Sequence, residues 1–114
     1  MKKNIKKYYF SESVAIDVGI EEALMLYNIY FWARMNEKNG INYHDGFYWT
    51  YNSATEFSVL YPFWTPCQIR RILKNLEEKE YVAVDKFNKM KYDRTKWYRP
   101  TSKTYAILAD IKKL

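Results

Sequence analysis

The strongest constraint in this sequence is a pair of helix starts that lie close together in the chain. Ser53-Ala54-Thr55-Glu56 and Thr65-Pro66-Cys67-Gln68 both have the capping-box pattern, in which the first and fourth side chains satisfy each other's backbone N–H groups. Pro66 strengthens the second start, because proline fits the first position of a helix. Pro62 lies between the two starts and ends the first helix near Leu60. The segment therefore predicts a short helix, a tight turn and a longer helix.

The longer helix has one clear apolar face. Ile69, Ile72, Leu73 and Leu76 recur at spacings of three and four residues, so they share one side of a helix that is expected to end near Lys79 or Glu80. On the short helix, Phe57 and Leu60 are expected to face inward. These two helices are therefore predicted to pack on a common core.

Another helix is predicted over residues 20–39. Glu21 and Glu22 favour its N-terminal end through the helix dipole, and Gly40 follows its last turn as a stop signal. The spacing of its apolar residues predicts one broad inward face. The residues expected on that face are Ile20, Ala23, Leu24, Tyr27, Tyr30 and Phe31.

The remaining segments predict strands and two terminal elements. Residues 81–87 and 95–99 are expected to form a hairpin around a basic loop at 88–94, with Pro100 closing the second strand. Asp45-Gly46 is a turn signal, and Phe47–Tyr51 is predicted to be a short strand. Residues 8–16 are interpreted as a strand or an extended segment, and residues 1–7 as a loose basic arm. Residues 101–114 are expected to form a C-terminal helix with four residues inward: Tyr105, Leu108, Ala109 and Ile111.

The order of these elements predicts the fold class. Helix, short strand, short helix, turn, longer helix and hairpin are the parts of a winged helix-turn-helix, in which the longer helix enters a DNA groove and the hairpin, or wing, touches phosphates. No repeat or linker interrupts the 114 residues, so the chain is interpreted as one α+β domain over residues 1–114.

The charge of the chain favours a polyanionic partner. The formal net charge is +6, and residues 65–99 hold ten Lys and Arg against five Asp and Glu. Nucleic acid is the first candidate for such a balance and an anionic membrane surface the second, while the plainest alternative is solubility. The concentration of charge in the predicted longer helix and wing favours double-stranded DNA.

Ten residues of this region are the candidate DNA contacts. Arg pairs with guanine, and Gln or Asn with adenine, through two hydrogen bonds, whereas lysines of a wing suit phosphates. The candidates are Thr65, Gln68, Arg70, Arg71, Lys74, Asn75, Lys89, Lys91, Arg94 and Lys96. The alternative is that these are a solvated helix face, with Lys74 paired to Glu77 or Glu78, and lysines that protect strand edges.

The sequence disfavours disulfide, metal, membrane and catalytic functions, because it lacks the residues or motifs that each of them requires. Cys67 and His44 are the single cysteine and histidine, which excludes an internal disulfide and disfavours zinc. A reducing compartment, the cytoplasm, is expected. No uncharged stretch reaches the roughly 18 apolar residues of a membrane span, and no signal-peptide core follows the basic start. No phosphate loop or nucleophile motif is found, so no catalytic residue, metal or cofactor is predicted.

The aromatic residues are interpreted mainly as core. The five expected inside are Phe47, Trp49, Phe57, Phe63 and Trp97. An exposed ring such as Tyr92 is the basis of one alternative, stacking on single-stranded nucleic acid.

Two stretches also resemble a known family. Tyr61–Thr65 with Ile69–Lys79, and Phe87–Lys89 with Asp93–Tyr98, resemble the winged-helix region of phage and plasmid replication proteins. These include phage replisome organisers, which are related to the N-terminal domain of the primosome protein DnaD. The resemblance implies a protein that acts on DNA at an origin or an operator, with Arg70, Arg71 and Lys74 facing the groove. Glu80 stands where such proteins often have Gly, so the longer helix is expected to end without a left-handed cap.

The charge, the order of the elements and the resemblance together predict two kinds of partner. Double-stranded DNA is the main one, for replication or transcription control, and no membrane is expected. The alternative is a protein-interaction module on the same scaffold, whose surplus aromatics serve a homodimer or a contact with a replication or host protein.

Overall fold

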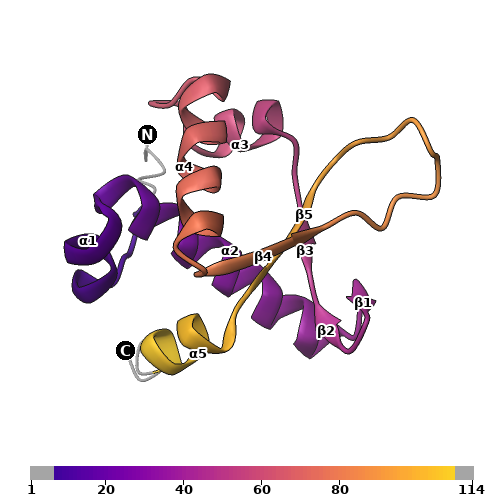
Figure 1. Ribbon diagram of the computed structural model, residues 1–114, viewed down its shortest axis with the longest axis horizontal. Coiled ribbons are helices and arrows are strands. Elements are labelled where there is room, and N and C mark those ends of the chain that lie inside the picture. Colours follow the sequence, from indigo (N-terminus) through magenta and orange to yellow (C-terminus); the bar gives the residue numbers. More distant parts are fainter. Residues whose placement is uncertain (1–6, 110–114) are drawn as a thin grey trace, which may run out of the picture.

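The computed structural model describes residues 7–109 and has a mixed α+β fold (Figure 1). Within this part of the chain there are five helices and two small antiparallel sheets. The helices are α1 (Glu12–Val18), α2 (Ile20–Asn39), α3 (Ala54–Leu60), α4 (Pro66–Glu78) and α5 (Ser102–Leu108). The strands are β1 (Tyr43–His44), β2 (Phe47–Tyr48), β3 (Thr50–Tyr51), β4 (Val82–Asp85) and β5 (Trp97–Pro100).

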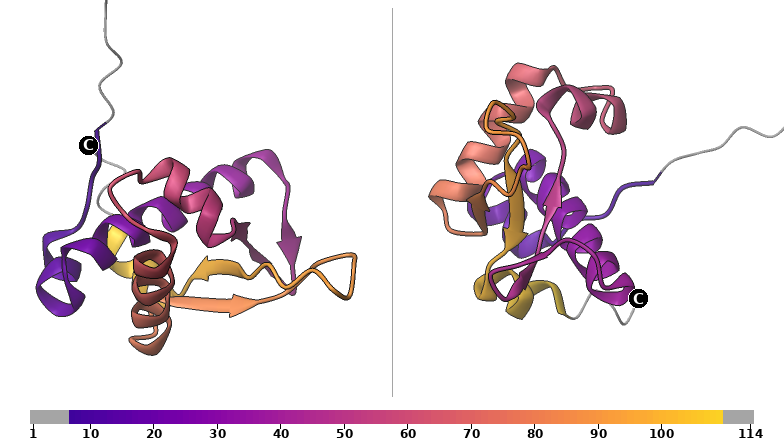
Figure 2. Two further views of the ribbon diagram at one scale, coloured as in Figure 1. Left: turned by 90° about the horizontal axis from the view of Figure 1, so that it is seen from above. Right: turned by 90° about the vertical axis from the view of Figure 1, so that its right-hand side faces the viewer.

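The larger sheet has the order β3-β5-β4, with both neighbouring pairs antiparallel. Val84 lies opposite Tyr98 and Asp85 opposite Trp97, so β4 and β5 form a hairpin. Its connection, residues 86–96, is named here the β4–β5 loop. Figures 1 and 2 show this loop extending well beyond the sheet, away from α1 and α5.

The smaller sheet is the hairpin β1–β2. Asp45 and Gly46 both have positive φ values, 54° and 84°, which is the backbone of the tight turn that an Asp-Gly pair favours. The predicted turn is confirmed. The predicted strand over residues 47–51 is instead divided at Trp49, so that β2 pairs with β1 and β3 with β5.

The prediction for residues 8–16 was wrong from Glu12 onward, where a helix begins; residues 8–11 form neither helix nor strand, and Tyr8 packs against the core. The Ser11 hydroxyl caps the helix by accepting the Val14 N–H at 3.4 Å, and Val14 is buried. Ser11 therefore marks a helix start of the kind read correctly at Ser53. Residues 1–6 of the predicted basic arm, and Ile111 in the C-terminal helix, lie outside the described residues.

Gly19 joins α1 directly to α2. Its φ is +114°, and a Cβ built there would lie 2.7 Å from Glu22 Oε1. Both the backbone conformation and the lack of space favour glycine.

Helix α2 has the predicted bounds, but its predicted inward face was only partly right: Ala23 and Tyr30 are buried, and other members of that face are not. Ile20 is 59% exposed and Phe31 is 42% exposed, whereas Met25 and Ile29 are fully buried. Apolar residues occur on every side of this helix, so their spacing does not select one face. Contacts with α4 and β5 select it in the folded chain.

Helices α3 and α4 confirm both capping boxes. The Ser53 hydroxyl accepts the Glu56 N–H at 3.1 Å, and the Glu56 carboxylate accepts the Ser53 N–H at 2.7 Å. All four apolar residues predicted to face inward from α4 are buried. Phe57 is buried and Leu60 packs against the core.

The end of α4 differs from its prediction. Glu80 has a φ of 62°, so the chain does use a left-handed residue there without a glycine. The Glu80 N–H donates to Glu77 O and the Tyr81 N–H to Leu76 O, both at 3.0 Å, which is the Schellman pattern. These hydrogen bonds and the burial of Tyr81 offset a backbone cost of about 1–2 kcal/mol.

The core lies between α2, α4 and the sheet. Of the five aromatic residues predicted inside, Trp49, Phe57 and Trp97 are buried, but Phe47 and Phe63 are about half exposed at 45% and 53%. In α5, Leu108 is buried as predicted and Tyr105 is half-buried, whereas Ala109 is exposed.

Candidate nucleic-acid interface

A hollow of about 670 Å³ lies where the start of α3, one side of α4 and the β4–β5 loop meet. Four basic side chains line it, together with a single acidic residue, Glu77. We call it the basic hollow, and its basic residues are Arg70, Lys74, Arg94 and Lys96.

The sequence places two of these cations on one side of α4. Arg70 and Lys74 are four residues apart, so they lie one above the other on the helix surface. Leu73, also part of the lining, anchors this side of the helix in the core. The Arg70 and Lys74 side chains are both exposed, so a bound anion can reach them.

The other two cations come from the β4–β5 loop, just before β5. Arg94 and Lys96 flank Thr95 and are exposed. Asn88 organises this part of the loop: its side-chain NH₂ donates to Asp93 O at 3.0 Å and to Thr95 O at 2.8 Å. Its side-chain oxygen accepts the Trp97 indole N–H at 2.8 Å, which ties the loop to the sheet.

Aromatic stacking supports the base of the same loop. The ring of Phe87 stacks on that of His44 with centroids 4.4 Å apart, and Trp97 stacks on Tyr51 at 4.2 Å. Hairpin β1–β2 thus contacts the root of the β4–β5 loop through His44. These ring contacts pack the base of the loop against hairpin β1–β2 and strand β3.

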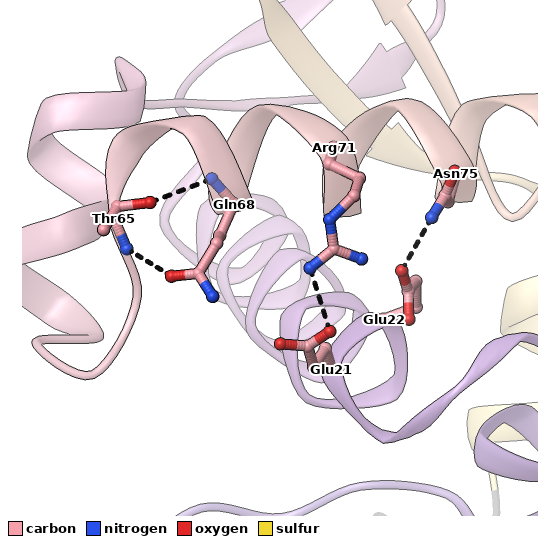
Figure 3. Close-up of polar contacts among 6 residues, drawn as sticks. All are labelled: Glu21, Glu22, Thr65, Gln68, Arg71 and Asn75. Atoms are coloured by element: carbon pink, nitrogen blue, oxygen red, sulfur yellow. Dashed lines mark hydrogen bonds and ion pairs between the residues drawn. The ribbon is translucent and has the colours of Figure 1, made fainter.

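An adjacent side of α4, about 100° around the helix from Arg70 and Lys74, faces acidic residues of α2 (Figure 3). Arg71 Nη2 donates to Glu21 Oε1 at 3.1 Å, and Asn75 Nδ2 donates to Glu22 Oε2 at 2.9 Å. Glu22 is only 4% exposed, so the Asn75 contact satisfies a buried carboxylate. Arg71 and Glu21 are half-exposed, at 51% and 39% of their side chains.

Two further candidate DNA contacts, Thr65 and Gln68, form hydrogen bonds with each other at the start of α4. The Thr65 hydroxyl accepts the Gln68 N–H at 3.2 Å, and the Gln68 side-chain oxygen accepts the Thr65 N–H at 2.8 Å. Figure 3 shows both contacts as dashed lines. The Gln68 NH₂ group still points outward as a donor in this arrangement. Cys67, beside it, is exposed and is a free thiol.

The ten candidates therefore fall into separate groups. Arg70, Lys74, Arg94 and Lys96 converge on the basic hollow. Lys89 and Lys91 are exposed farther out on the β4–β5 loop and do not line it. Thr65 and Gln68 hold the start of α4, while Arg71 and Asn75 contact α2.

Two buried tyrosines flank α4 on its two sides. Burial raises the pKa of Tyr98, which lines the basic hollow, to about 12, and the nearby Glu77 carboxylate adds to the effect. Burial and then the hydrogen bond to Asp17 raise the pKa of Tyr81 to about 12. That bond, 2.5 Å from the Tyr81 hydroxyl to Asp17 Oδ2, lowers the pKa of Asp17.

Sequence reasoning missed three residues that shape this surface. Asn88 holds the conformation of the β4–β5 loop through its hydrogen bonds. In the sequence, only its residue type, which is common in turns, pointed to such a role. Glu21 and Glu22 were assigned only to the helix dipole, because nothing in the sequence showed that they reach α4. Their partners lie some fifty residues away in the chain.

Residues 7–109 offer neither a metal-binding cluster nor a membrane-spanning helix. No group of three or more His, Cys, Asp or Glu side chains within residues 7–109 is arranged to hold a metal ion. In the same range, no helix has the length and apolar character that crossing a bilayer requires.

Known proteins give no guide to the role of the basic hollow, so its role is inferred from the residues that line it. No protein-family model, curated protein sequence or solved structure matches the chain.

Proposed function

We propose that this protein is a winged helix-turn-helix domain that binds double-stranded DNA and catalyses no reaction on it. The observation that carries the proposal is the basic hollow, in which four cations from α4 and the β4–β5 loop meet. Phosphates along a DNA groove are evenly spaced anions, and a concave cationic surface neutralises several of them at once.

The arrangement of elements supports the same proposal. In winged helices, a short helix and a turn precede the recognition helix, and a hairpin wing follows it. Here α3, the turn at residues 61–65, α4 and the β4–β5 hairpin occur in that order, with β3 as the third strand. In this assignment α4 enters the major groove and the β4–β5 loop is the wing.

The candidate side chains are expected to have two different roles, contact with phosphates and contact with bases. Arg70, Lys74, Arg94 and Lys96 contact phosphates or groove edges from the basic hollow. Lys89 and Lys91 extend the phosphate contacts along the loop. Arg70 is the side chain best placed to read bases, because Arg71 and Asn75 already have partners in α2 and the Gln68 side-chain oxygen accepts the Thr65 N–H.

The resemblance of residues 61–79 and 87–98 to phage and plasmid replication proteins favours an origin or an operator as the target. In that setting the protein works in the cytoplasm, in replication or in transcription control. The DNA-binding proposal itself does not depend on this biological setting.

The test is fluorescence anisotropy with a labelled duplex over a salt series. With about four phosphate contacts, log K is expected to fall against log salt with a slope of roughly −4. Lys96→Ala is expected to reduce that slope by about 1, as the loss of one phosphate contact does. Lys38→Ala, on α2, is the matched control and should leave slope and affinity unchanged.

Two results would overturn the proposal. One is binding that does not respond to salt. The other is an unchanged slope in Lys96→Ala together with an equal affinity for single-stranded DNA, which would favour base stacking over groove binding.

A further inference from the structure

A second hollow, about 310 Å³, lies between the C-terminal half of α2 and strand β3. We call it the Trp32 hollow, after the exposed ring of α2 that borders it. It meets the basic hollow at Asn52, which lines both hollows and lies between β3 and α3. A ligand held by the cations of the basic hollow can therefore reach the Trp32 hollow across a single residue.

Two half-exposed aromatic rings border the Trp32 hollow. Trp32 on α2 is 43% exposed, and Tyr51 on β3 is 47% exposed. The Tyr51 ring stacks on Trp97 with centroids 4.2 Å apart, so one of its faces is covered and its exposed surface lies on the opposite face and the edge. Exposed rings that the fold holds in place suit the stacking of another flat ring, and every nucleobase offers such a face.

Asparagine side chains supply polar groups in the Trp32 hollow. The NH₂ group of Asn36 is already used, because it donates to Trp49 O at 2.7 Å. The side-chain amides of Asn42 and Asn52 have no such partner among residues 7–109. An amide presents a donor and an acceptor side by side, which is the pattern that pairs with the edge of a base.

The described residues that line the Trp32 hollow include no charged side chain, whereas four cations line the basic hollow. The two hollows together therefore place a cationic surface beside a neutral one of rings and amides. A nucleotide has the complementary order, with an anionic phosphate on one side of the sugar and a flat neutral base on the other.

We infer that the Trp32 hollow binds one unpaired nucleobase of a DNA strand whose phosphates lie in the basic hollow. The inference rests on the proposed function and narrows its ligand to a duplex with an unpaired nucleotide beside it. A paired base cannot enter the hollow, because its neighbours in the stack cover both faces and its partner base covers its pairing edge.

The first test compares three DNA ligands by fluorescence anisotropy. They are a blunt duplex, the same duplex with a short single-stranded extension, and the duplex with an abasic extension of equal length. The abasic extension has the same phosphates, so it controls for charge. The wild-type protein is expected to bind the base-bearing extension about tenfold more tightly than the abasic one, which is the gain from one stacked base.

Two variants locate the bound base. Trp32→Ala is expected to reduce the affinity ratio between the two extended ligands to near one. Tyr92, 78% exposed on the β4–β5 loop, is another ring available for stacking, and Tyr92→Ala is the matched control that should keep the wild-type ratio. Circular dichroism checks that both variants are folded, as expected from the exposure of the altered side chains.

Intrinsic fluorescence gives a second reading at the hollow itself. Trp32 is the exposed tryptophan, whereas Trp49, Trp64 and Trp97 are each at most 7% exposed. A base stacked on Trp32 is expected to quench its emission, and the abasic extension is expected to leave the emission unchanged. Trp32→Phe keeps a ring for stacking, so it should lose the quenching while the affinity ratio stays well above one.

A wild-type ratio near one would overturn the inference, as would a ratio that Trp32→Ala leaves unchanged. A ratio lowered by Tyr92→Ala alone would assign the base to the β4–β5 loop and not to the hollow.

The same ligands distinguish failure of this inference from failure of the proposed function. Salt-dependent binding of the blunt duplex without a gain from the base would reject only the Trp32 hollow as a base site. Base-dependent binding with quenching of Trp32, but without binding of the blunt duplex, would reject only the duplex as the ligand. No binding of any of the three ligands would overturn both.

Discussion

The two sides of α4 have similar residues and very different surroundings. On the side of the basic hollow, Arg70 and Lys74 face further cations of the β4–β5 loop, with Glu77 as the single acidic neighbour in the lining. On the other side, Arg71 and Asn75 each contact a glutamate of α2. One side therefore has unbalanced positive charge, whereas on the other side the single cation, Arg71, is already paired with a carboxylate of the protein.

This contrast shows that residue type alone does not make a binding side chain. Arg70 and Arg71 are adjacent in the chain, yet among residues 7–109 only the second has an anionic partner. An external phosphate must compete with Glu21 for Arg71, whereas it meets Arg70 without such competition. The predictions that follow test this contrast, beginning with the largest expected change.

The largest effect is expected from alkaline pH, through the buried tyrosine on each side of α4. The pKa values of Tyr81 and Tyr98 are raised to about 12, so the folded state favours the neutral phenols. Their contribution to stability is complete below pH 10 and is lost as pH rises toward 12, at about 1.4 kcal/mol per pH unit for each. Denaturant unfolding across this range measures the loss.

Matched variants connect that loss to the two tyrosines. Tyr98→Phe and Tyr81→Phe are each expected to remove part of the decline above pH 10. Tyr92→Phe, whose ring is 78% exposed, is the control and should decline as the wild type does. An unchanged decline in both core variants would contradict the prediction.

Asn75→Ala is expected to destabilise the fold by about 2 kcal/mol, because it leaves the buried Glu22 carboxylate without its hydrogen-bond donor. Thermal or chemical unfolding measures the change. Lys74→Ala, one residue earlier on the open side, should alter stability by less than about 0.5 kcal/mol. If Asn75→Ala instead keeps its stability and loses DNA binding, Asn75 belongs to the interface and the contrast fails.

Arg70→Ala is expected to weaken duplex binding by about 1 kcal/mol, roughly fivefold, and Arg71→Ala by about half of that free energy. The reason is that Arg71 gives up an internal ion pair when it contacts DNA, whereas Arg70 does not. Anisotropy titrations of both variants at the same salt concentration decide between them. A larger loss of duplex affinity in Arg71→Ala than in Arg70→Ala would show that the side of α4 facing α2 contributes more to DNA binding.

The smallest effect is expected from Glu21→Gln, which releases Arg71. An exposed ion pair contributes no more than about 1 kcal/mol to stability, so unfolding should change by less than about 0.5 kcal/mol. Duplex affinity should rise about twofold, because the arginine no longer has to leave a carboxylate. A fall in affinity would show that the ion pair holds Arg71 in position for DNA.

Local signals in the sequence determined most of the secondary structure. The hydroxyl, carboxyl and amide side chains of two capping boxes act within four residues, so Ser53 and Thr65 predicted the starts of α3 and α4 correctly. The Asp45-Gly46 turn and the Gly40 stop are equally local. The same kind of signal at Ser11 was overlooked, and a strand or extended segment was predicted in place of α1.

The face of each helix was predictable only where polar and apolar residues separate. On α4 they do, and Ile69, Ile72, Leu73 and Leu76 are all buried as expected. On α2 apolar residues surround the axis, and the predicted face was wrong at Ile20 and Phe31, which are exposed, although Ala23 and Tyr30 are buried. The physical reason is that the hydrophobic effect has no direction of its own, so a helix without a polar side is oriented by its neighbours.

The sequence by itself thus determined most of the elements, the basic character of residues 65–99 and the side of α4 that is buried. The tertiary structure decided which cations share a surface. Arg94 and Lys96 reach Arg70 and Lys74 because β5 pairs with β4 and Asn88 shapes the loop, while Arg71 and Asn75 contact glutamates some fifty residues away. Such contacts depend on how α2 and α4 are placed relative to each other. The spacing of residues within one helix does not determine that placement.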